Sequence, residues 1–218
     1  RFDADRGVRE ALCQDVHVAV LDEPTSSQSE TVAIGVEMVD PPGPFLVKDS
    51  DNYFEVDIEP TTGGFVAVDS LNNHDLINPR NKSYLITDHN GLITSIREKE
   101  VISDLFSVGG YQFPNTSTFL EYYEALSGRR AVDAGELYLS DVISAMLLDG
   151  LPFGVRHVTG YEDWGTVDEW QRHLESAATI FVSIDGFVFE RGSAYFAPRF
   201  EDVAPNERAI DALRVAAS

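Results

Sequence analysis

The residues best suited to chemistry form an acidic cluster that follows a short apolar run. Phe45 to Lys48 is predicted to be a buried strand, and Asp49 and Asp51 come directly after it. A further carboxylate, Asp163, belongs to a loop far along the chain. Two carboxylates from distant strands can hold one magnesium ion whose shell is completed by water and phosphate. We therefore expect Asp51 and Asp163 to form a magnesium site, although an Asp-x-Asp sequence also occurs as a simple turn with solvated charges.

The composition predicts a globular protein whose partners are small anions. With 43% hydrophobic residues, the 218-residue chain can bury one core, or one core and a small second unit. Sixteen basic and 37 acidic residues give a formal net charge of −21, which repels nucleic acid polymers and anionic membranes. A phosphorylated substrate stays compatible, because a divalent cation and one or two lysines reverse the potential locally.

The sequence also favours a cytoplasmic location. No apolar run approaches the roughly 20 residues that span a bilayer, and no basic, apolar leader opens the sequence. Cys13 is the single cysteine, which excludes an intramolecular disulfide and a thiolate cage for zinc, and we interpret it as a small apolar filler. Whether the chain forms a homo-oligomer stays open.

The order of predicted elements is typical of an α/β domain. Turn residues 88–91 join two strands as a hairpin, and a glycine pair inside one strand indicates close approach of a ligand or another backbone. Because ligands bind beyond the carboxyl ends of strands in open α/β sheets, the acidic cluster lies at the expected edge. The fold prediction is a three-layer α/β/α domain with a mixed, mainly parallel sheet. The predicted strands are 16–21, 45–48, 64–68, 83–87, 92–96 and 106–113, and the predicted helices are 1–14, 29–39, 116–126, 138–148 and 167–177.

Four short motifs resemble those of sugar-1-phosphate nucleotidyltransferases. That family carries an apolar strand ending in Gly-Asp-Asn or a variant, a Glu-Lys motif after a hairpin, a Gly-Gly-Tyr strand and a late Gly-Thr loop. The similarity covers roughly Val16 to Leu174. The motifs appear here as Asp51-Asn52, Glu98-Lys99, Gly109-Gly110-Tyr111 and Asp163-Trp164-Gly165-Thr166, with a further Gly-Glu segment at Gly135-Glu136.

The resemblance implies a reaction and a site. A sugar 1-phosphate oxygen would attack the α-phosphorus of a nucleoside triphosphate and release pyrophosphate, as in nucleotide-sugar and polysaccharide biosynthesis. Asp51 and Asp163 would bind Mg²⁺. Lys99 would contact the sugar phosphate and Glu98 a sugar hydroxyl, although Glu98-Lys99 alone also fits a solvated hairpin end. The other implied substrate contacts are Asn52, Ser83, Gly110, Tyr111 and Glu136.

Residues 23–31 resemble the family's loop beside the nucleotide base. Gln28, Glu30 and Thr31 are the implied nucleotide contacts, while Ser27 and Glu30 also fit the capping box of a helix. The family's Gly-x-Gly-x-Arg loop and Pro-Lys-x-Leu segment, which cradle the triphosphate, do not occur in these 218 residues. We therefore expect residues 1–177 to be a nucleotidyltransferase-like domain without its first strands, with impaired catalysis unless a longer parent protein supplies them.

The carboxyl end carries a second resemblance. Phe181 to Gly186 is similar to the Asp-x-Asp-Gly motif of haloacid-dehalogenase-like phosphatases, after small residues that predict a linker near Ala178. Ser183 replaces the nucleophilic aspartate and lacks an adjacent activating histidine. We interpret residues 178–218 as a truncated domain, with Asp185 as its metal-binding candidate. A non-catalytic sugar-phosphate or nucleotide-binding module and a phosphatase remain the alternatives to a transferase.

Two further residue types receive predictions. The five histidines show no metal-binding spacing, so packing or surface roles are expected. Trp164 and Trp170 are expected to fill the core behind the magnesium loop rather than to stack on a base.

Overall fold

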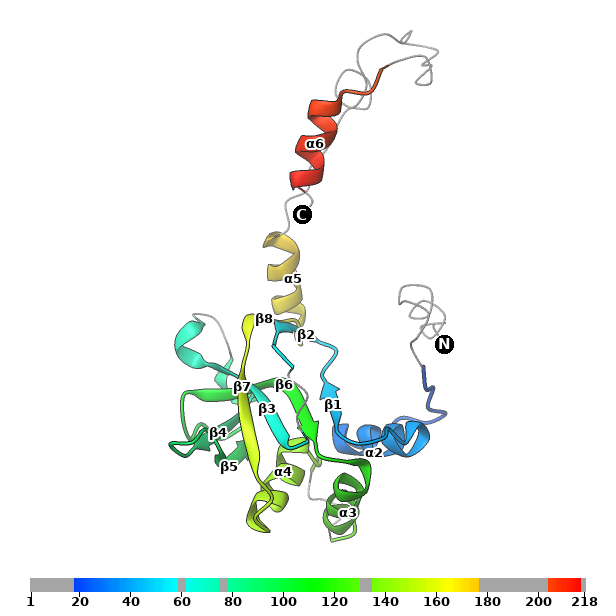
Figure 1. The fold of residues 1–218 in the computed structure, drawn as a ribbon, viewed down its shortest axis with the longest axis vertical. Helices are drawn as coiled ribbons and strands as arrows, with labels where there is room; N and C mark the ends of the chain where they lie inside the picture. Colours follow the sequence, from blue (N-terminus) through cyan, green and yellow to red (C-terminus); the bar gives the residue numbers. More distant parts are fainter. Residues whose placement is uncertain (1–17, 59–61, 75–77, 130–134, 177–203, 217–218) are drawn as a thin grey trace. The chain divides into compact units, whose positions relative to one another are not determined.

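The computed structural model describes residues 18–58, 62–74, 78–129, 135–176 and 204–216 (Figure 1). It divides into two units, Arg1–Trp170 and Gln171–Ser218. The predictions for residues 1–14, for Cys13 and for the motif at Phe181 to Gly186 lie outside the described residues. Residues 18–21, which were predicted to belong to a strand, are not in one.

A mixed sheet of six described strands forms the centre of the first unit. Its order is β5-β4-β6-β3-β7, and β1 also pairs with β6. The parallel pair is β3 with β7, whereas the pairs of β6 with β1, β3 and β4 and of β4 with β5 are antiparallel. The strands are β1 Phe45–Lys48, β3 Gly64–Ser70, β4 Ser83–Thr87, β5 Ile93–Glu98, β6 Leu105–Phe113 and β7 Phe153–His157.

The predicted α/β fold with a mixed sheet is confirmed, but its described strand pairs are mostly antiparallel rather than mainly parallel. The connection between β4 and β5 explains part of this difference in strand direction. A tight turn closed by the main-chain bond from Gly91 N to Asp88 O joins β4 directly to β5, which makes a hairpin instead of a crossover. The long strand β6 then runs antiparallel to every described neighbour.

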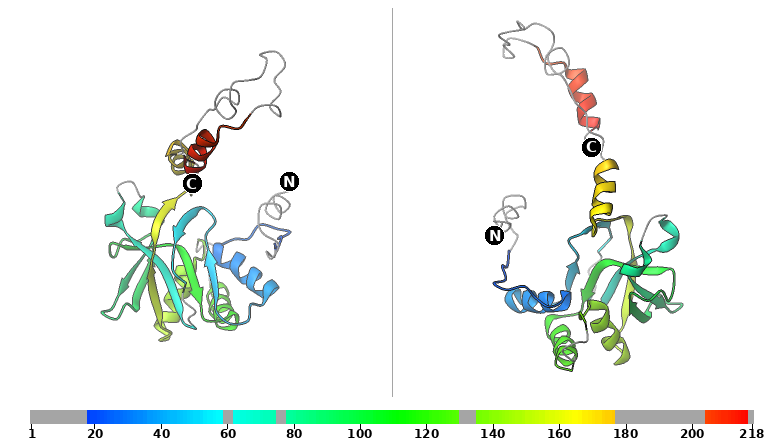
Figure 2. Two further views of the ribbon diagram at one scale, coloured as in Figure 1. Left: turned by 45° about the horizontal axis from the view of Figure 1, so that its top comes forward. Right: turned by 180° about the vertical axis from the view of Figure 1, so that it is seen from behind.

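Three helices cover one face of this sheet (Figures 1 and 2). They are α2 Gln28–Val39, α3 Thr116–Ser127 and α4 Leu139–Leu148. Their apolar residues, among them Val36, Phe119 and Ile143, form one buried cluster with Val66, Leu85 and other residues of the sheet. Burial of such side chains stabilises each by about 1.5–3 kcal/mol, so this layer fixes the sheet that carries the site.

A short antiparallel pair, β2 Asn52–Glu55 and β8 Thr159–Asp163, covers the other face. Phe54 and Tyr161 from this pair share a buried cluster with Phe106 of β6. In β2 only Asn52 and Phe54 are buried, so the pair is anchored by alternate side chains. Neither strand was predicted, and nor was β7.

The remaining described elements are short. Two 3₁₀ helices, η1 Leu71–Asn73 and η2 Pro79–Asn81, precede β4. Helix α5 covers Val167–Ser176, as predicted, and the division between the units falls within it. In the second unit α6 covers Glu207–Ala216, and the Asn206 side chain accepts from Ala209 N at 3.3 Å. Among the helices of the described residues, we find none with the length and apolar character needed to cross a membrane.

Candidate active site

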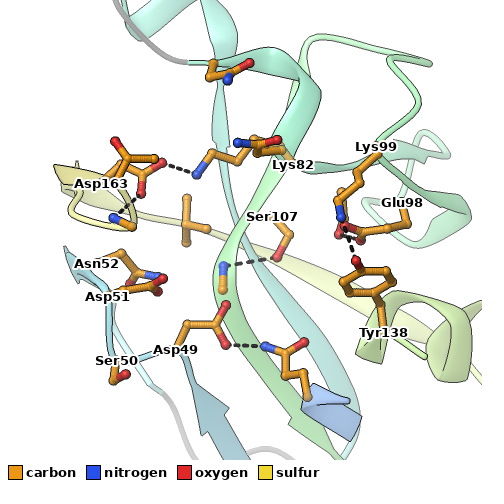
Figure 3. Close-up of a pocket in the computed structure, with 18 of the residues that line it drawn as sticks. Asp49, Ser50, Asp51, Asn52, Lys82, Glu98, Lys99, Ser107, Tyr138 and Asp163 are labelled. Carbon is orange, nitrogen blue, oxygen red and sulfur yellow. Dashed lines mark hydrogen bonds and ion pairs between the residues drawn. The ribbon is translucent and has the colours of Figure 1, made fainter. Parts of the chain in front are cut away.

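A cavity of about 630 Å³ opens on one edge of strand β6 (Figure 3). On this edge β1 pairs with Gly110–Phe113 of β6, and β4 pairs with it at Phe106. Residues 107–109 lie between these two partners and line the cavity. The remaining wall comes from the β1–β2 turn, η2, the end of β5, residues 136–138 and the β8–α5 loop. A cavity of this size fits a small molecule of a few hundred daltons.

Strand pairing brings Asp51 and Asp163 together at this cavity. Asn52 is the register partner of Asp163, and Trp164 N donates to the main-chain oxygen of Asp51 at 2.8 Å. A Cβ atom added to Gly165 would lie 3.1 Å from Asp51 Oδ2 and 3.3 Å from Asp163 Oδ1. The glycine therefore leaves open a small space that both carboxylates border.

This space suits a magnesium ion by the chemistry of its donors. Magnesium is commonly held by one or two carboxylates, with waters and substrate phosphates filling its other positions. In the part of the chain that the structure describes, no group of three or more His, Cys, Asp or Glu residues is arranged to hold a metal by itself. A shared ion at Asp51 and Asp163 stays a prediction, and it would depend on substrate oxygens.

Lys82 is the main site residue that the motifs did not identify. Its Nζ atom forms an ion pair with Asp163 Oδ2 and donates to the Tyr161 hydroxyl at 2.8 Å. The ammonium group also lies 5.4 Å from the centre of the Tyr161 ring, within the range of a cation–π interaction. A compositional signal did exist, since the chain has three lysines, and Lys48, Lys82 and Lys99 all lie in or next to this site.

Lys48 supports the acidic turn from beside the cavity. Its Nζ atom donates to Asn52 Oδ1 at 2.7 Å and to the main-chain oxygens of Asn52 and Asp49 at 2.8 and 2.9 Å. It also lies 4.6 Å from the centre of the Phe54 ring. Burial lowers the pKa of Lys48, against the opposing effect of the neighbouring carboxylates. Lys48 thus holds the turn that presents Asp51.

Asp49 is the buried carboxylate of the cluster. Burial and the nearby charge of Asp51 raise the pKa of Asp49 to about 6. Gln28, one of the predicted nucleotide contacts, lines the cavity, and its Nε2 atom donates to Asp49 Oδ1 at 2.5 Å. The predicted close approach at the glycine pair is that of Asp49, because a Cβ atom on Gly109 would overlap with Asp49 Oδ2. Gly109 has φ +82°, which only glycine adopts readily.

The far wall holds the residues expected to bind the sugar phosphate. Ser83 Oγ donates to Glu98 Oε2, and Ser140 Oγ donates to the same oxygen at 2.8 Å. Lys99 Nζ donates to the Tyr138 hydroxyl at 2.6 Å, and this bond raises the pKa of Lys99. These bonds fix Glu98 and Lys99 in orientations that line the cavity.

Lys99 also has an unusual backbone. Its φ is +57°, in the left-handed region that is costly for a side chain other than glycine. The Lys99 N–H donates to the main-chain oxygen of Lys82 at 2.9 Å, which ties the two lysines of the wall together. Strain of this kind is concentrated at functional sites.

The other predicted substrate residues divide into two groups. Asn52, Tyr111 and Glu136 line the cavity, and burial raises the pKa of the Tyr111 phenol, which keeps it neutral. Gly110 does not line it, because this residue faces Ala67 and Phe54 on the opposite side of β6.

Glu30 and Thr31 also lie away from the cavity wall. Glu30 Oε2 accepts from Ser26 N at 2.5 Å and from Ser26 Oγ at 2.6 Å, and Thr31 Oγ1 donates to Ser27 O at 3.2 Å. Ser27 caps α2 by accepting from Glu30 N at 3.1 Å. The local interpretation, helix capping, therefore accounts for these two side chains.

The tryptophans pack outside the cavity. Trp164 stacks on Tyr53 with ring centres 6.3 Å apart and meets Trp170 edge-on at 5.8 Å. Trp170 is 44% exposed, so the prediction that it fills the core is wrong. The three rings form a surface cluster behind the β8–α5 loop.

Comparisons with known proteins agree with this fold. A scan against protein-family models gave no match, and a search of curated proteins gave none. Among solved structures, the chain is similar to a nucleoside-diphosphate-sugar pyrophosphorylase from Vibrio cholerae, with 25% identity and a TM-score of 0.69 over 80% of this chain and 77% of that one.

Two more distant structures support the fold alone. An inositol-1-phosphate CTP transferase from T. maritima has 14% identity and a TM-score of 0.53 over 71% of this chain and 65% of its own. A UDP-glucose pyrophosphorylase complexed with UDP-glucose has 14% identity and a TM-score of 0.57 over 80% and 72%. The chain therefore has the fold of nucleotide-diphospho-sugar transferases. The similarity to the Vibrio cholerae protein supports a nucleotidyltransferase in general terms.

Proposed function

We propose that this protein forms a nucleoside-diphosphate sugar from a sugar 1-phosphate and a nucleoside triphosphate, with release of pyrophosphate. The observation that carries the proposal is the convergence of Asp51 and Asp163 on Gly165, in one cavity with Lys82 and Lys99. In a chain with a formal net charge of −21, two of the three lysines line this one cavity. The same lining holds six carboxylates, so phosphate binding there would depend on these lysines together with a divalent cation that reverses the potential locally.

The reaction requires no proton transfer at the attacking atom. An ionised oxygen of the sugar phosphate forms a bond to the α-phosphorus, while the bond from that phosphorus to the bridging oxygen of the β-phosphate breaks. The electron pair of the broken bond leaves with pyrophosphate. Catalysis of such transfers depends mainly on positioning and on neutralising charge.

The residues of the far wall would position the sugar phosphate. Lys99 would bind its phosphate by a charge-assisted hydrogen bond. Glu98, held by Ser83 and Ser140, would accept from a sugar hydroxyl. Tyr111 at the floor stays a neutral donor because burial raises its pKa.

Asp51 and Asp163 would hold a magnesium ion, which supplies charge neutralisation at the phosphates. Gly165 leaves room for such an ion, because a side chain at this position would obstruct both carboxylates. Lys48 contributes by bonding Asn52, which keeps the turn in place.

The test is magnesium-dependent pyrophosphate release, measured with a panel of nucleoside triphosphates and sugar 1-phosphates. Asp51→Asn and Asp163→Asn should each reduce release to background, with unchanged circular dichroism. Asp168→Asn, an exposed residue of α5 outside the cavity lining, is the matched control and should retain wild-type turnover. Absence of release from every wild-type reaction, or full activity of Asp163→Asn, would reject the proposal.

A binding module without turnover is the alternative function. It predicts that sugar phosphate binds without turnover. Calorimetry with sugar phosphate, with and without nucleotide, separates the two functions. The phosphatase alternative depends on residues 181–186, which are outside the described part of the chain.

A further inference from the structure

We propose that Lys82 is a second phosphate-binding lysine. Before substrate arrives, its ammonium group pairs with Asp163. When a cation binds the Asp163 carboxylate, the ammonium group pairs with a phosphate of the nucleotide instead. This inference rests on the proposed function. It assigns Lys99 to the phosphate of the sugar 1-phosphate and Lys82 to the α-phosphate of the nucleotide.

The first support is the division of Asp163 between two positive partners. Its Oδ1 atom accepts from Gly165 N at 3.2 Å and borders the space at Gly165 that Asp51 also borders, whereas its Oδ2 atom pairs with the Lys82 ammonium (Figure 3). A cation bound at Oδ1 and an ammonium group at Oδ2 would repel each other across one carboxylate. Binding of the ion therefore weakens the hold of Asp163 on Lys82.

The second support is that Lys82 is already inside the cavity wall. Its side chain is only 12% exposed, and that of Asp163 is 18% exposed, so bulk water screens the pair poorly. An ammonium group released in such a place needs a new anionic partner. A phosphate oxygen held by the same cation would supply such a partner.

The third support is the way in which Lys82 is anchored. Its main-chain oxygen accepts from Lys99 N at 2.9 Å, which fixes the base of the side chain, while the four-carbon stem leaves the ammonium free to change partner. Tyr161 is 8% exposed, burial raises the pKa of its phenol, and its neutral hydroxyl accepts from the Lys82 ammonium. The backbone of Lys82 is therefore held in place, while its ammonium group can move.

The inference also explains why two lysines line one cavity. Lys99 is bound to Tyr138 on the far wall, and Lys82 is bound to Asp163 on the near wall. The two substrates bring two separate phosphate groups to the α-phosphorus. One lysine for each group is the simplest assignment, because Lys48 is already bonded to three oxygens of the Asp49–Asn52 turn.

The experiment compares Mn²⁺ binding and nucleotide binding in Lys82→Met, Lys82→Arg and wild type. Electron paramagnetic resonance with Mn²⁺ alone should show binding at least about threefold tighter in Lys82→Met, because an ammonium group no longer competes for Asp163. With Mn²⁺ present, binding of ATP, CTP, GTP or UTP, whichever wild type binds best, should be weaker by about tenfold or more. Lys82→Arg keeps the charge and should restore the wild-type Mn²⁺ affinity.

The matched control is Arg80→Met, which removes one positive charge from the neighbouring, exposed position of η2 outside the cavity lining. It should change neither affinity. If Lys82→Met unfolds, Lys82→Gln replaces it.

Equal or weaker Mn²⁺ binding in Lys82→Met than in Arg80→Met, or unchanged nucleotide affinity, would overturn the inference. Absence of pyrophosphate release from wild type would count against the proposed function alone, because the Mn²⁺ comparison does not depend on turnover.

Discussion

Asn52 lies directly opposite Asp163 in the antiparallel pair of β2 and β8. This register sets the geometry of the candidate site, because it places the preceding residue, Asp51, beside the Asp163–Gly165 loop. The bond from Trp164 N to Asp51 O locks the arrangement at 2.8 Å. A slip of one residue would turn the side chains of β2 to the opposite faces and separate the two carboxylates.

The space at Gly165 gives a prediction about cation binding. Gly165→Ala should fold normally, since this glycine does not have a positive φ, but its methyl group would enter the space between Asp51 and Asp163. We expect Mn²⁺ to bind about tenfold more weakly, which corresponds to about 1.4 kcal/mol. Gly154→Ala, at a position with no atom within 4 Å of the added Cβ, is the control. Equal Mn²⁺ affinity in the two variants would contradict a cation site at Gly165.

Gly109 and Gly150 allow the effects of backbone strain and steric overlap to be separated. Both have φ +82°, but a Cβ on Gly109 would overlap with Asp49, whereas one on Gly150 would meet nothing within 4 Å. Gly150→Ala should lower the free energy of unfolding by about 1 kcal/mol from backbone strain alone. Gly109→Ala should lower it by about 1–3 kcal/mol more through overpacking. Urea denaturation measures both, and equal losses would show that Asp49 moves aside freely.

The left-handed backbone of Lys99 predicts opposite effects on stability and binding. Lys99→Gly and Lys99→Ala both remove the ammonium group and should weaken sugar phosphate binding by about tenfold or more. Only the glycine variant relieves the strain at φ +57°, so it should be more stable than the alanine variant by about 1 kcal/mol. Thermal unfolding and calorimetry with sugar phosphate give the two readouts. An alanine variant as stable as the glycine variant would show that this backbone carries no strain.

The pair of Asp69 and His74 predicts a pH dependence of stability. Burial raises the pKa of Asp69, but hydrogen bonds from His74, Asn73 and Ser70 N outweigh it, and the pKa is lowered overall. A carboxyl group whose pKa is lower in the folded state than in the unfolded state stabilises the protein when the pH is above the unfolded-state pKa. This contribution is lost as the pH falls through the folded-state pKa.

Asp69→Asn should therefore unfold more easily than wild type at pH 7, by about 1 kcal/mol or more. The difference should shrink as the pH falls below about 4, where the unfolded carboxyl takes up its proton. Asp57→Asn, at an exposed position, is the control. A difference that stays constant between pH 7 and pH 3 would contradict this account.

Much of the first unit could be predicted from local patterns. The apolar runs of β1, β3, β4 and β6 and the turn before β5 are continuous in sequence, so their elements were identified. Strands β2 and β8 could not be, because Asn52–Glu55 and Thr159–Asp163 are short and polar and become strands only through pairing with each other. The motifs still selected both members of this pair, since β2 begins directly after Asp51 and β8 ends at Asp163.

Lys82 shows a different limit of prediction from the sequence. A single lysine before a strand matches no motif, and only the ion pair with Asp163 shows that it belongs to the site. Glu30 and Thr31 stay predicted nucleotide contacts, and the structure adds that both side chains make hydrogen bonds at the start of α2. Local capping was readable from the sequence and accounts for both.

The irregularity in β6 has a consequence for how this protein could change its substrate. Ala67 pairs with Gly110 but Val68 pairs with Ser107, so Val108 and Gly109 form a bulge that faces the cavity. Part of the floor is thus main chain, which amino-acid replacement barely alters, and Gly109 cannot accept a side chain without displacing Asp49. Under the proposed function, changes in sugar preference should therefore be concentrated in the rim residues, while this part of the floor keeps its shape.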